Sequence, residues 1–531
     1  MLRVSQLKLT LDDPIEKVRE LALQALRAKD EEILDFRIFK QSIDARKRGE
    51  LRLVYTVDVA LENEEEILDL KLPNIVKAPQ LQYAMPERGA RKLARRPVVV
   101  GFGPAGMFAA LLLAQMGYRP IVLERGADVD QRVKDIESFW TEGKLDPNSN
   151  VQFGEGGAGT FSDGKLTTRV KDLRGRKVLE ELVAAGAPED ILFMAHPHVG
   201  TDLLRGVVKN IRETINRLGG EVRFNTQVKE FIVEDGALKG LKTNAGTIET
   251  DQAIVAIGHS ARDTFHKLHE AGTQLTAKPF AVGIRIEHPQ SVIDKAQYKE
   301  FAGHEKLGAA EYRLAHQAAN GRGVYTFCMC PGGLVVPAAS EKGRLVTNGM
   351  SEHARDQANA NAGVLVQVGP EDFGSDHPLA GIEFQRRLEE KAFGMGGSSY
   401  VAPAQTVGDF LKGHGSKKLG SVQPSYALGV KPSNLHKLFS QEITDAMKEG
   451  IKAFDRKLRG FAMADAVMTG VESRSSSPVR IDRDPDSLQS LTVSGLYPSG
   501  EGAGFAGGIV SAGIDGLKCA ESLIRDFDKP E

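Results

Sequence analysis

The chain has 531 residues, enough for roughly three domains, and its 69 Lys and Arg against 71 Asp and Glu leave a net charge of −2. That balance argues against a protein built mainly to hold nucleic acid or an anionic membrane. Three cysteines exclude a disulfide scaffold and fit a reducing compartment. The first residues show no signal-peptide pattern and no apolar run is long enough to span a bilayer, so we expect a cytoplasmic protein without a membrane partner.

Residues 1–88 are predicted to form a small α+β unit. Alternating apolar residues and a helical start at Pro14 give the order strand, helix, strand, strand. The predicted elements are a strand over residues 3–9, a helix over 14–28, and strands over 33–43 and 51–61. A basic linker over residues 88–96 separates this unit from the rest of the chain.

The last two of these strands are joined through the basic cluster Arg46, Lys47 and Arg48. Such a cluster can bind phosphate, so an RNA-holding unit is one hypothesis. A solvated turn explains the cluster equally well, and the charge of the first 96 residues is nearly balanced. Nucleic acid is therefore the less favoured of the candidate partners.

Residues 98–106, VVVGFGPAG, combine an apolar strand with G-x-G-x-x-G spacing. Gly101 would permit the tight turn, Gly103 would let a pyrophosphate approach the backbone, and Gly106 would let the following helix pack on the strand. A second apolar run ends at Glu124, where the carboxylate can accept hydrogen bonds from an adenosine ribose. The free N–H groups at the helix N-terminus would face the phosphates. We therefore predict a dinucleotide site on a strand–turn–helix–strand unit.

Two later segments return to this glycine-rich character. An apolar strand runs into Gly258, and residues 495–504, GLYPSGEGAG, form a strand that enters a turn with glycines and an acid. A helix is predicted to follow, over residues 510–524. We expect a binding domain made of residues 96–262 and 461–531, interrupted by an inserted substrate domain over residues 263–460.

The C-terminal turn resembles that of FAD-linked oxidoreductases of the glutathione-reductase type. In those enzymes the acid accepts a hydrogen bond from the ribityl chain, and the N-terminus of the next helix stabilises negative charge on the reduced flavin. The acid here is Glu501, one methylene longer than the usual Asp.

The chain as a whole resembles the bacterial FAD-dependent dehydrogenases, also called NAD(FAD)-utilising dehydrogenases, within the FAD/NAD(P)-binding oxidoreductase superfamily. The resemblance implies FAD as cofactor and an α/β fold, with a Rossmann-like FAD-binding domain of the glutathione-reductase type, an inserted α+β substrate domain and the N-terminal α+β unit. The segments that carry it are GFGPAG (101–106), GEGGAGTFSDGKL (154–166), PHVGTD (197–202), FAVGIRIEHPQ (280–290), CMCPGG (328–333), VTNGMS (346–351), SPVRI (477–481) and YPSGEGAGFAGGI (497–509).

The resemblance also implies which residues hold FAD. From the pyrophosphate and adenosine end to the flavin end they are Gly101, Gly103, Pro104, Ala105, Gly106, Glu124, Arg125, Val228, Gly157, Gly159, Thr160, Asp163, Lys165, Gly258, Gly500, Glu501, Gly508 and Ile509. Lys165 would favour anionic reduced flavin by Coulomb attraction, or would be a surface lysine in a turn.

Lys165, His198 and Cys330 are the candidate catalytic residues. On a strand, Cys328 and Cys330 would face one side, where they could meet the flavin or a substrate. Buried cysteines that pack as small apolar residues are the favoured alternative, and Cys519 is assigned to a helix core. His198 is an acid/base candidate.

Other polar residues receive lesser roles. We expect His196 to be structural, because no carboxylate or cysteine cluster completes a metal set around it. His259 would lie beside the cofactor, behind the residues that contact it directly. Arg285, Glu287 and His288 would either line the substrate side or lie on an exposed face of a strand.

The predicted function is an FAD-dependent oxidoreductase that acts on a small molecule, with NADH or NADPH as candidate reductant. No second complete G-x-G-x-x-G marks a nicotinamide site. The alternatives are a flavin-dependent tRNA-modifying enzyme and a protein that uses FAD structurally.

Overall fold

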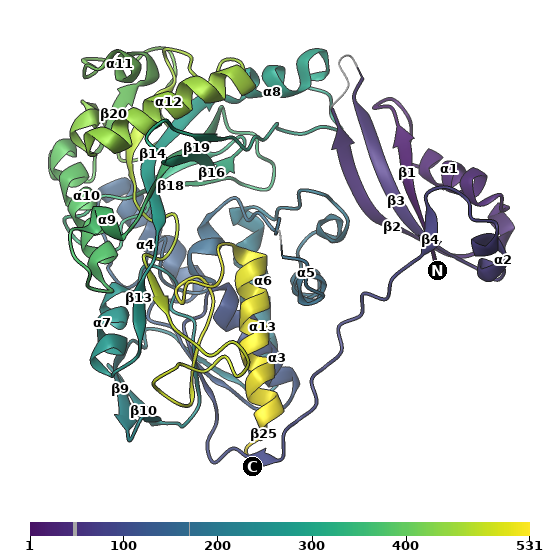
Figure 1. Cartoon of the computed structure of the whole chain (residues 1–531), viewed down its shortest axis with the longest axis horizontal. Coiled ribbons are helices and arrows are strands. Elements are labelled where there is room, and N and C mark those ends of the chain that lie inside the picture. The colour runs from purple at the N-terminus through teal and green to yellow at the C-terminus, as the bar shows by residue number, and fades with distance from the viewer. Residues whose placement is uncertain (46–49, 169) are drawn as a thin grey trace.

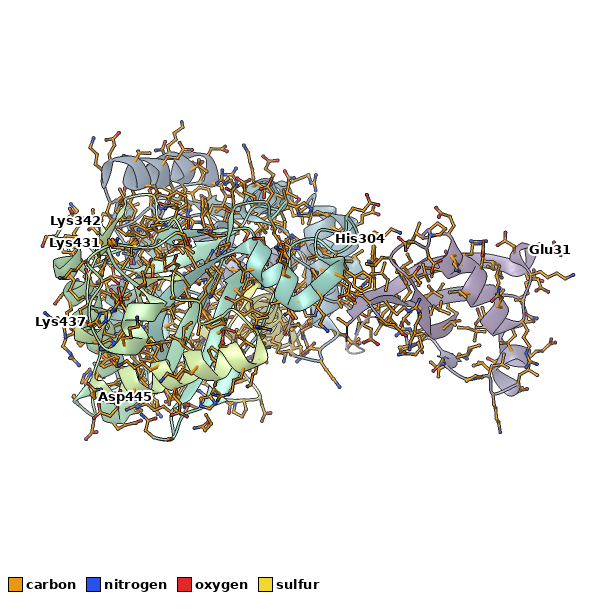
Figure 2. The ribbon with its side chains drawn as sticks, turned by 90° about the horizontal axis from the view of Figure 1, so that it is seen from above. Glu31, His304, Lys342, Lys431, Lys437 and Asp445 are labelled. Carbon is orange, nitrogen blue, oxygen red and sulfur yellow. The ribbon has the colours of Figure 1, made fainter. Side chains whose placement is uncertain are left out.

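The computed structural model describes residues 1–45, 50–168 and 170–531, so the cluster Arg46, Lys47 and Arg48 lies outside the described residues. The chain forms a large two-part body and a small N-terminal unit that stands beside it (Figure 1). Figure 2 shows the same separation from above, with His304 at the junction. None of the helices in the described ranges is long and apolar enough to cross a bilayer.

The N-terminal unit is an antiparallel sheet, in the order β2-β3-β1-β4, with helix α1 on it. Alternate residues of β3 are buried, as expected for a sheet with one covered face. Its elements are β1 (Leu2–Leu9), α1 (Lys17–Leu26), β2 (Ile33–Asp44), β3 (Arg52–Leu61), α2 (Glu64–Asp69) and β4 (Ile75–Lys77). The predicted strand–helix–strand–strand order is observed, with α2 and β4 in addition.

A parallel sheet, in the order β24-β12-β6-β7-β8, forms the centre of the nucleotide-binding part. Helix α3 is buried on all sides because it lies between this sheet and α13, and its sequence is accordingly apolar throughout. The elements are β6 (Val98–Val100), α3 (Pro104–Gln115), β7 (Ile121–Leu123), α4 (Val129–Glu142), α5 (Arg174–Ala184), α6 (Thr201–Arg217), β8 (Glu221–Arg223), β9 (Val228–Glu234), β10 (Ala237–Thr243), β11 (Gly246–Glu249), β12 (Ala253–Val255), α7 (Arg262–Glu270), β24 (Leu496–Pro498) and α13 (Ile509–Asp526).

The second part contains a seven-stranded sheet, in the order β15-β16-β19-β14-β22-β20-β21. Its strands are β14 (Phe280–Pro289), β15 (Ala315–Gln317), β16 (Gly323–Cys330), β19 (Asn359–Val368), β20 (Ala402–Thr406), β21 (Val430–Pro432) and β22 (Val467–Glu472). Around it lie α8 (Gln290–Tyr298), α9 (Pro370–Phe373), α10 (Ala380–Gly396), α11 (Val407–Lys412), α12 (Gln441–Lys457) and the short pair β17 (Leu334–Pro337) with β18 (Thr347–Met350). A second short pair, β13 (Leu275–Ala277) with β23 (Val479–Ile481), packs with the core of the parallel sheet.

The position of β22 differs from the domain boundary expected at residue 460. This strand pairs with β14 in the middle of the second sheet, so the second part of the body extends beyond residue 460 to at least Glu472. The central position of β14 also corrects the expectation for Arg285, Glu287 and His288. All three are fully buried, because β19 and β22 flank the strand and both of its faces are covered.

The segment that joins the N-terminal unit to the body is docked on the nucleotide-binding part. Tyr83 donates from its hydroxyl to Glu521 of α13 at 2.8 Å, and the Gly89 N–H donates to the Ile524 carbonyl at 2.8 Å. Strand β5 (Arg91–Lys92) then pairs with β25 (Phe527–Asp528). The expected boundary at residue 88 therefore lies within a segment that packs with the body.

Candidate cofactor and active site

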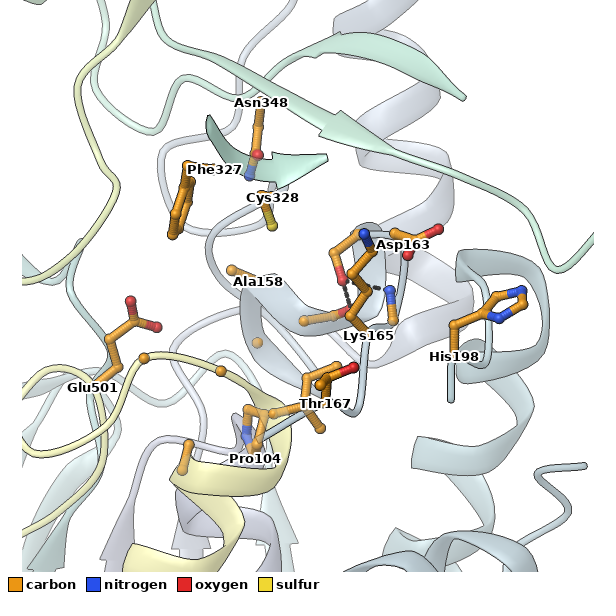
Figure 3. Close-up of a pocket in the computed structure, with 18 of the residues that line it drawn as sticks. Pro104, Ala158, Asp163, Lys165, Thr167, His198, Phe327, Cys328, Asn348 and Glu501 are labelled. Carbon is orange, nitrogen blue, oxygen red and sulfur yellow. Dashed lines mark hydrogen bonds between the residues drawn. The ribbon is translucent and has the colours of Figure 1, made fainter. Parts of the chain in front are cut away.

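A continuous cavity of about 1330 Å³ lies between the carboxyl edge of the parallel sheet and the second part. Its lining runs from Val228 past Gly103 and Ile509 to Cys328, and Figure 3 shows its inner end. The cavity is larger than the ~300–1,000 Å³ of ordinary ligand pockets. It therefore has room for a dinucleotide and a further molecule.

The three glycines of the first motif have three different surroundings. Gly101 has φ of +98°, and a Cβ there would lie 2.4 Å from the Ala256 carbonyl oxygen. At Gly106 a Cβ would lie 2.0 Å from the Gly101 oxygen, so the helix packs directly against the turn. At Gly103 the nearest atom is the Gly157 Cα, 3.7 Å away, and the residue lines the cavity. The space beside Gly103, at the start of α3, is open, and any side chain at this position would fill it. Phosphate binding at a helix N-terminus requires such an open cradle.

Glu124 is buried at the edge of this turn. Its carboxylate accepts hydrogen bonds from the backbone N–H groups of Phe102 at 2.9 Å, Gly126 at 2.9 Å and Gly154 at 3.0 Å. It therefore holds two glycine-rich loops together and also lines the cavity. The ribose contact stays a prediction. Arg125 pairs with Asp263 at 2.9 Å and lines the cavity nearby.

The second glycine-rich segment crosses the first at close range. A Cβ on Gly157 would lie 2.8 Å from the Gly103 Cα, and one on Gly159 would lie 3.2 Å from an Ile509 side-chain carbon. Both residues line the cavity, whereas the Thr160 hydroxyl points to the Glu155 carbonyl at 3.3 Å. The structure thus places these glycines, but not the Thr160 side chain, on the cavity wall.

The C-terminal turn and the start of α13 bound the part of the cavity that a dinucleotide would occupy. Gly258, Glu501, Gly508 and Ile509 line the cavity there. Gly500 instead packs behind the wall. Its N–H donates to Asp515 of α13 at 2.7 Å, a contact for which the sequence offered no signal.

The Glu501 side chain points into the cavity (Figure 3), and its carboxylate has no hydrogen-bond partner among the described residues. Burial raises the pKa of its carboxyl to about 7, and the nearby Lys278 ammonium opposes that rise. A polar group in this state can donate or accept a hydrogen bond to a ligand hydroxyl. The ribityl contact is the predicted use of that capacity.

Beyond the C-terminal turn, the cavity continues into a part lined by Lys165, Glu311 and Cys328, which we call the inner chamber. Two ion pairs lie there. Lys165 pairs with Glu311 at 2.8 Å, and His196 lies 3.2 Å from the same carboxylate. Asp163 is buried against Arg355, whose Nε donates to it at 2.9 Å. Glu311 balances the charge of Lys165, and the effect of this ammonium on reduced flavin stays a prediction. Glu311 and Arg355 come from the second part and carried no recognisable motif.

Two of the histidines that line the cavity, His198 and His259, have lowered pKa values and are neutral in this environment. Burial, then the charge of Arg355, lowers the pKa of His198, whose Nε2 lies 3.1 Å from the His353 carbonyl oxygen. Since a carbonyl only accepts, Nε2 carries the hydrogen and Nδ1 remains a base. Burial lowers the pKa of His259 to about 3, and its ring bonds to Ser260 at 2.9 Å.

The two cysteines of β16 do not share a face, contrary to expectation. A bulge interrupts the pairing with β19 between Phe327 and Cys330, and Cys328 takes a φ of +43°. Cys328 lines the cavity, whereas Cys330 is fully buried and its thiol donates to the Cys328 carbonyl at 3.2 Å. The structure therefore does not bring Cys330, the predicted catalytic cysteine, to the cavity.

Arg285 holds this bulge from behind. Its guanidinium donates to the Cys328 carbonyl at 2.7 Å and pairs with buried Glu472 at 2.6 Å. Burial raises the pKa of the Cys328 thiol, while the charges of Arg285 and Lys165 lower it. Cys328 is a neutral thiol that faces the inner chamber.

These surroundings fit FAD. The open cradle at Gly103 and the α3 N-terminus suit a pyrophosphate, the channel between Val228 and Ile509 suits an extended dinucleotide, and Glu501 offers an unpartnered polar group at the flavin end. Fold and site together define a flavoprotein of the FAD-dependent oxidoreductase class.

Comparison with known proteins agrees. Residues 279–475 match the family described as "FAD-dependent protein, C-terminal domain-like", and residues 1–60 match a domain of unknown function. A protein of Clostridium beijerinckii, described as uncharacterized, is 50% identical over 100% of both chains. The chain therefore belongs to the same family as this relative, and its match to the FAD-dependent family model identifies FAD as its cofactor.

The solved structures that resemble this chain have low sequence identity to it and low TM-scores. Glycine oxidase from Bacillus cereus is 11% identical, with a TM-score of 0.36 over 80% of this chain and 94% of that one. L-Proline dehydrogenase from P. horikoshii is 13% identical, with a TM-score of 0.33 over 84% and 95%. We infer nothing about the substrate from them.

A chain that begins at residue 79 is expected to fold and to retain FAD. The N-terminal unit has its own apolar core, and the docked segment from Tyr83 to β5 remains in the shortened chain. Flavin released from the purified protein gives the stoichiometry. A chain that begins at residue 93 is the comparison, because it also loses the docked segment and should unfold at a lower temperature. A colourless 79–531 protein would contradict the prediction.

Proposed function

We propose that the protein is an FAD-dependent dehydrogenase whose substrate is a small polar molecule bound in the inner chamber. The observation that carries this proposal is the extent of the cavity. It continues past the flavin end, at Glu501 and Ile509, into a chamber lined by Cys328, Lys165 and Glu311. A protein that used FAD only structurally would have no need of this second chamber.

The chamber residues would bind and orient the substrate. FAD supplies the hydride or electron transfer when bound. Lys165 and Glu311 offer a donor and an acceptor 2.8 Å apart, and a polar substrate can insert between them or bridge both. Nδ1 of His198, which the tautomer leaves unprotonated, is the group that would take a proton. The second part supplies Glu311 and Cys328 to the wall of the chamber.

The test is anaerobic mixing of the holoprotein with a panel of small polar metabolites, with NADH and with NADPH, while the flavin absorption is followed. A compound that bleaches the flavin identifies the substrate or the reductant. Bleaching by dithionite alone would support a structural use of FAD. Bleaching or product formation only with tRNA would support the nucleic-acid alternative.

For a reducing substrate, Lys165→Met should slow flavin reduction by roughly 10²-fold, the loss that a misplacement of about 1 Å can cause. FAD content should not change, because Lys165 pairs with Glu311 of the second part. Lys437→Met, at an exposed lysine on the far side of the body (Figure 2), is the matched control. Equal rates in both variants would remove Lys165 from the substrate site.

A further inference from the structure

Among the described residues, the N-terminal unit contacts the body at Gln41 and at Lys306 and Leu307, and these three residues line the same cavity as the inner chamber. Gln41, Ser42, Ile43 and Ala45, at the end of β2, line the same cavity as Cys328 and Lys165. The unit is therefore part of the cavity wall, although Figure 1 shows it standing apart from the rest of the chain.

The first contact extends the sheet of the unit onto the nucleotide-binding part. Strand β2 is an edge strand, and Gln41 pairs in parallel with Met194. The Gln41 N–H donates to the Phe193 carbonyl at 2.8 Å, and the Ala195 N–H donates to the Gln41 carbonyl at 2.8 Å. An edge strand otherwise leaves such groups unpaired, so this pairing is a specific attachment.

The second contact joins the unit to the second part of the body. Leu307 is buried in the apolar core of the unit, with Phe301 packed against it. Beside it, the Lys306 ammonium donates to the carbonyls of Leu11 at 2.6 Å and Asp13 at 2.7 Å. Figure 2 shows the neighbouring His304 at this junction.

The two contacts are connected to the two halves of the Lys165–Glu311 pair. Ala195 is followed directly by His196, and the next residue, Pro197, accepts from the Leu166 N–H at 2.9 Å. That places the first contact one short loop from Lys165. Glu311 follows Leu307 by four residues, so the second contact lies on the segment that carries the other half of the pair. The N-terminal unit thus joins the segments from which both groups come.

We propose that the N-terminal unit forms the mouth of the substrate chamber, restricts entry by size, and fixes the Lys165–Glu311 pair across it. This proposal rests on the proposed function, because a mouth matters only if a substrate enters the chamber. The physical claim concerns access to the chamber and is tested without a substrate.

Cys328 provides the probe of access. It lines the chamber, whereas Cys330 and Cys519 are fully buried. In the full-length holoprotein we would measure the rates at which methyl methanethiosulfonate, a small reagent, and fluorescein maleimide, a bulky one, modify the thiol. Cys328→Ser gives the background rate. The ratio of the two rates reports the width of the mouth.

Two variants loosen the two contacts separately. Gln41→Pro removes the N–H that bonds to Phe193, and proline is tolerated on an edge strand whose N–H points away from its own sheet. Gln41→Ala retains that bond and removes the same side chain from the cavity wall, so it is the control with which Gln41→Pro is compared. Lys306→Met removes both hydrogen bonds of an exposed ammonium, and its control is Lys295→Met, at an exposed lysine whose ammonium makes no hydrogen bond among the described residues.

In Gln41→Pro and Lys306→Met the bulky reagent should react roughly tenfold faster relative to the small one, which corresponds to about 1.4 kcal/mol. Lys295→Met should match the natural chain, Gln41→Pro should show a higher ratio than Gln41→Ala, and FAD content should be unchanged in all. Unchanged ratios in both folded variants would overturn the proposal. Loss of FAD with an unchanged ratio would also overturn it, since the unit would then support the nucleotide site. A failure to find any substrate would leave the labelling result intact and would count only against the proposed function.

Discussion

Replacing Gly103 with valine is expected to give a folded protein that binds FAD roughly 10²-fold more weakly, as an overpacking cost of about 1–3 kcal/mol implies. The backbone of Gly103 has a negative φ of −76°, so valine adds no strain there. Its side chain would point into the cradle, where the nearest atom to a Cβ is 3.7 Å away. The new methyl groups would occupy the approach of the pyrophosphate.

Titration of the apoprotein with FAD measures this loss, and thermal unfolding of the apoprotein shows whether the fold is intact. Gly206→Val is the matched control, because Gly206 is exposed on α6 and a Cβ there meets nothing within 4 Å. Full affinity in Gly103→Val would mean that the phosphates do not lie at the start of α3.

Glu501→Gln is expected to remove a pH dependence from the stability of the apoprotein. Burial raises the pKa of this carboxyl from 4.5 to about 7. The folded state therefore binds more protons than the unfolded state between these values, and the free energy of unfolding falls as the pH rises from about 4.5 through about 7. At pH 8 the loss approaches about 3 kcal/mol by the usual conversion of pKa shifts.

Glutamine mimics the protonated carboxyl at every pH. The variant should therefore match the natural apoprotein near pH 4.5 and exceed it at pH 8, which denaturant unfolding at both values would measure. Lys278→Met serves as a second test, because it removes the ammonium that favours the ionised form and should steepen the fall. A natural apoprotein whose stability does not change over this range would show that Glu501 is well solvated.

Local motifs were predictable because their causes are local. Gly101 and Gly106 are required by a turn and by a helix that contacts that turn, and both requirements arise within nine residues of one strand–turn–helix unit. The apolar α3 and the strand before Gly258 follow from periodicity in the same way. The family resemblance added FAD, which the family match supports.

The expectations that failed depended on neighbours distant in sequence. Alternation put Cys328 and Cys330 on one face, but a bulge against β19, with Arg285 bonded to the bulged carbonyl, turns only Cys328 to the cavity. Arg285 is of a residue type that usually lies on the protein surface. It is buried because β14 lies between β19 and β22, and Glu472 of β22 supplies the opposite charge.

The sequence by itself determined the nucleotide-binding unit, since each glycine acts through backbone geometry within a few residues of its own position. The inner chamber was decided only by the tertiary structure. Lys165, Glu311 and Cys328 come from separate loops and strands, and the edge of β2 completes the wall from a unit more than a hundred residues away from any of them. Side chains gathered in this way interact through space, and no periodicity along the chain records which of them will meet.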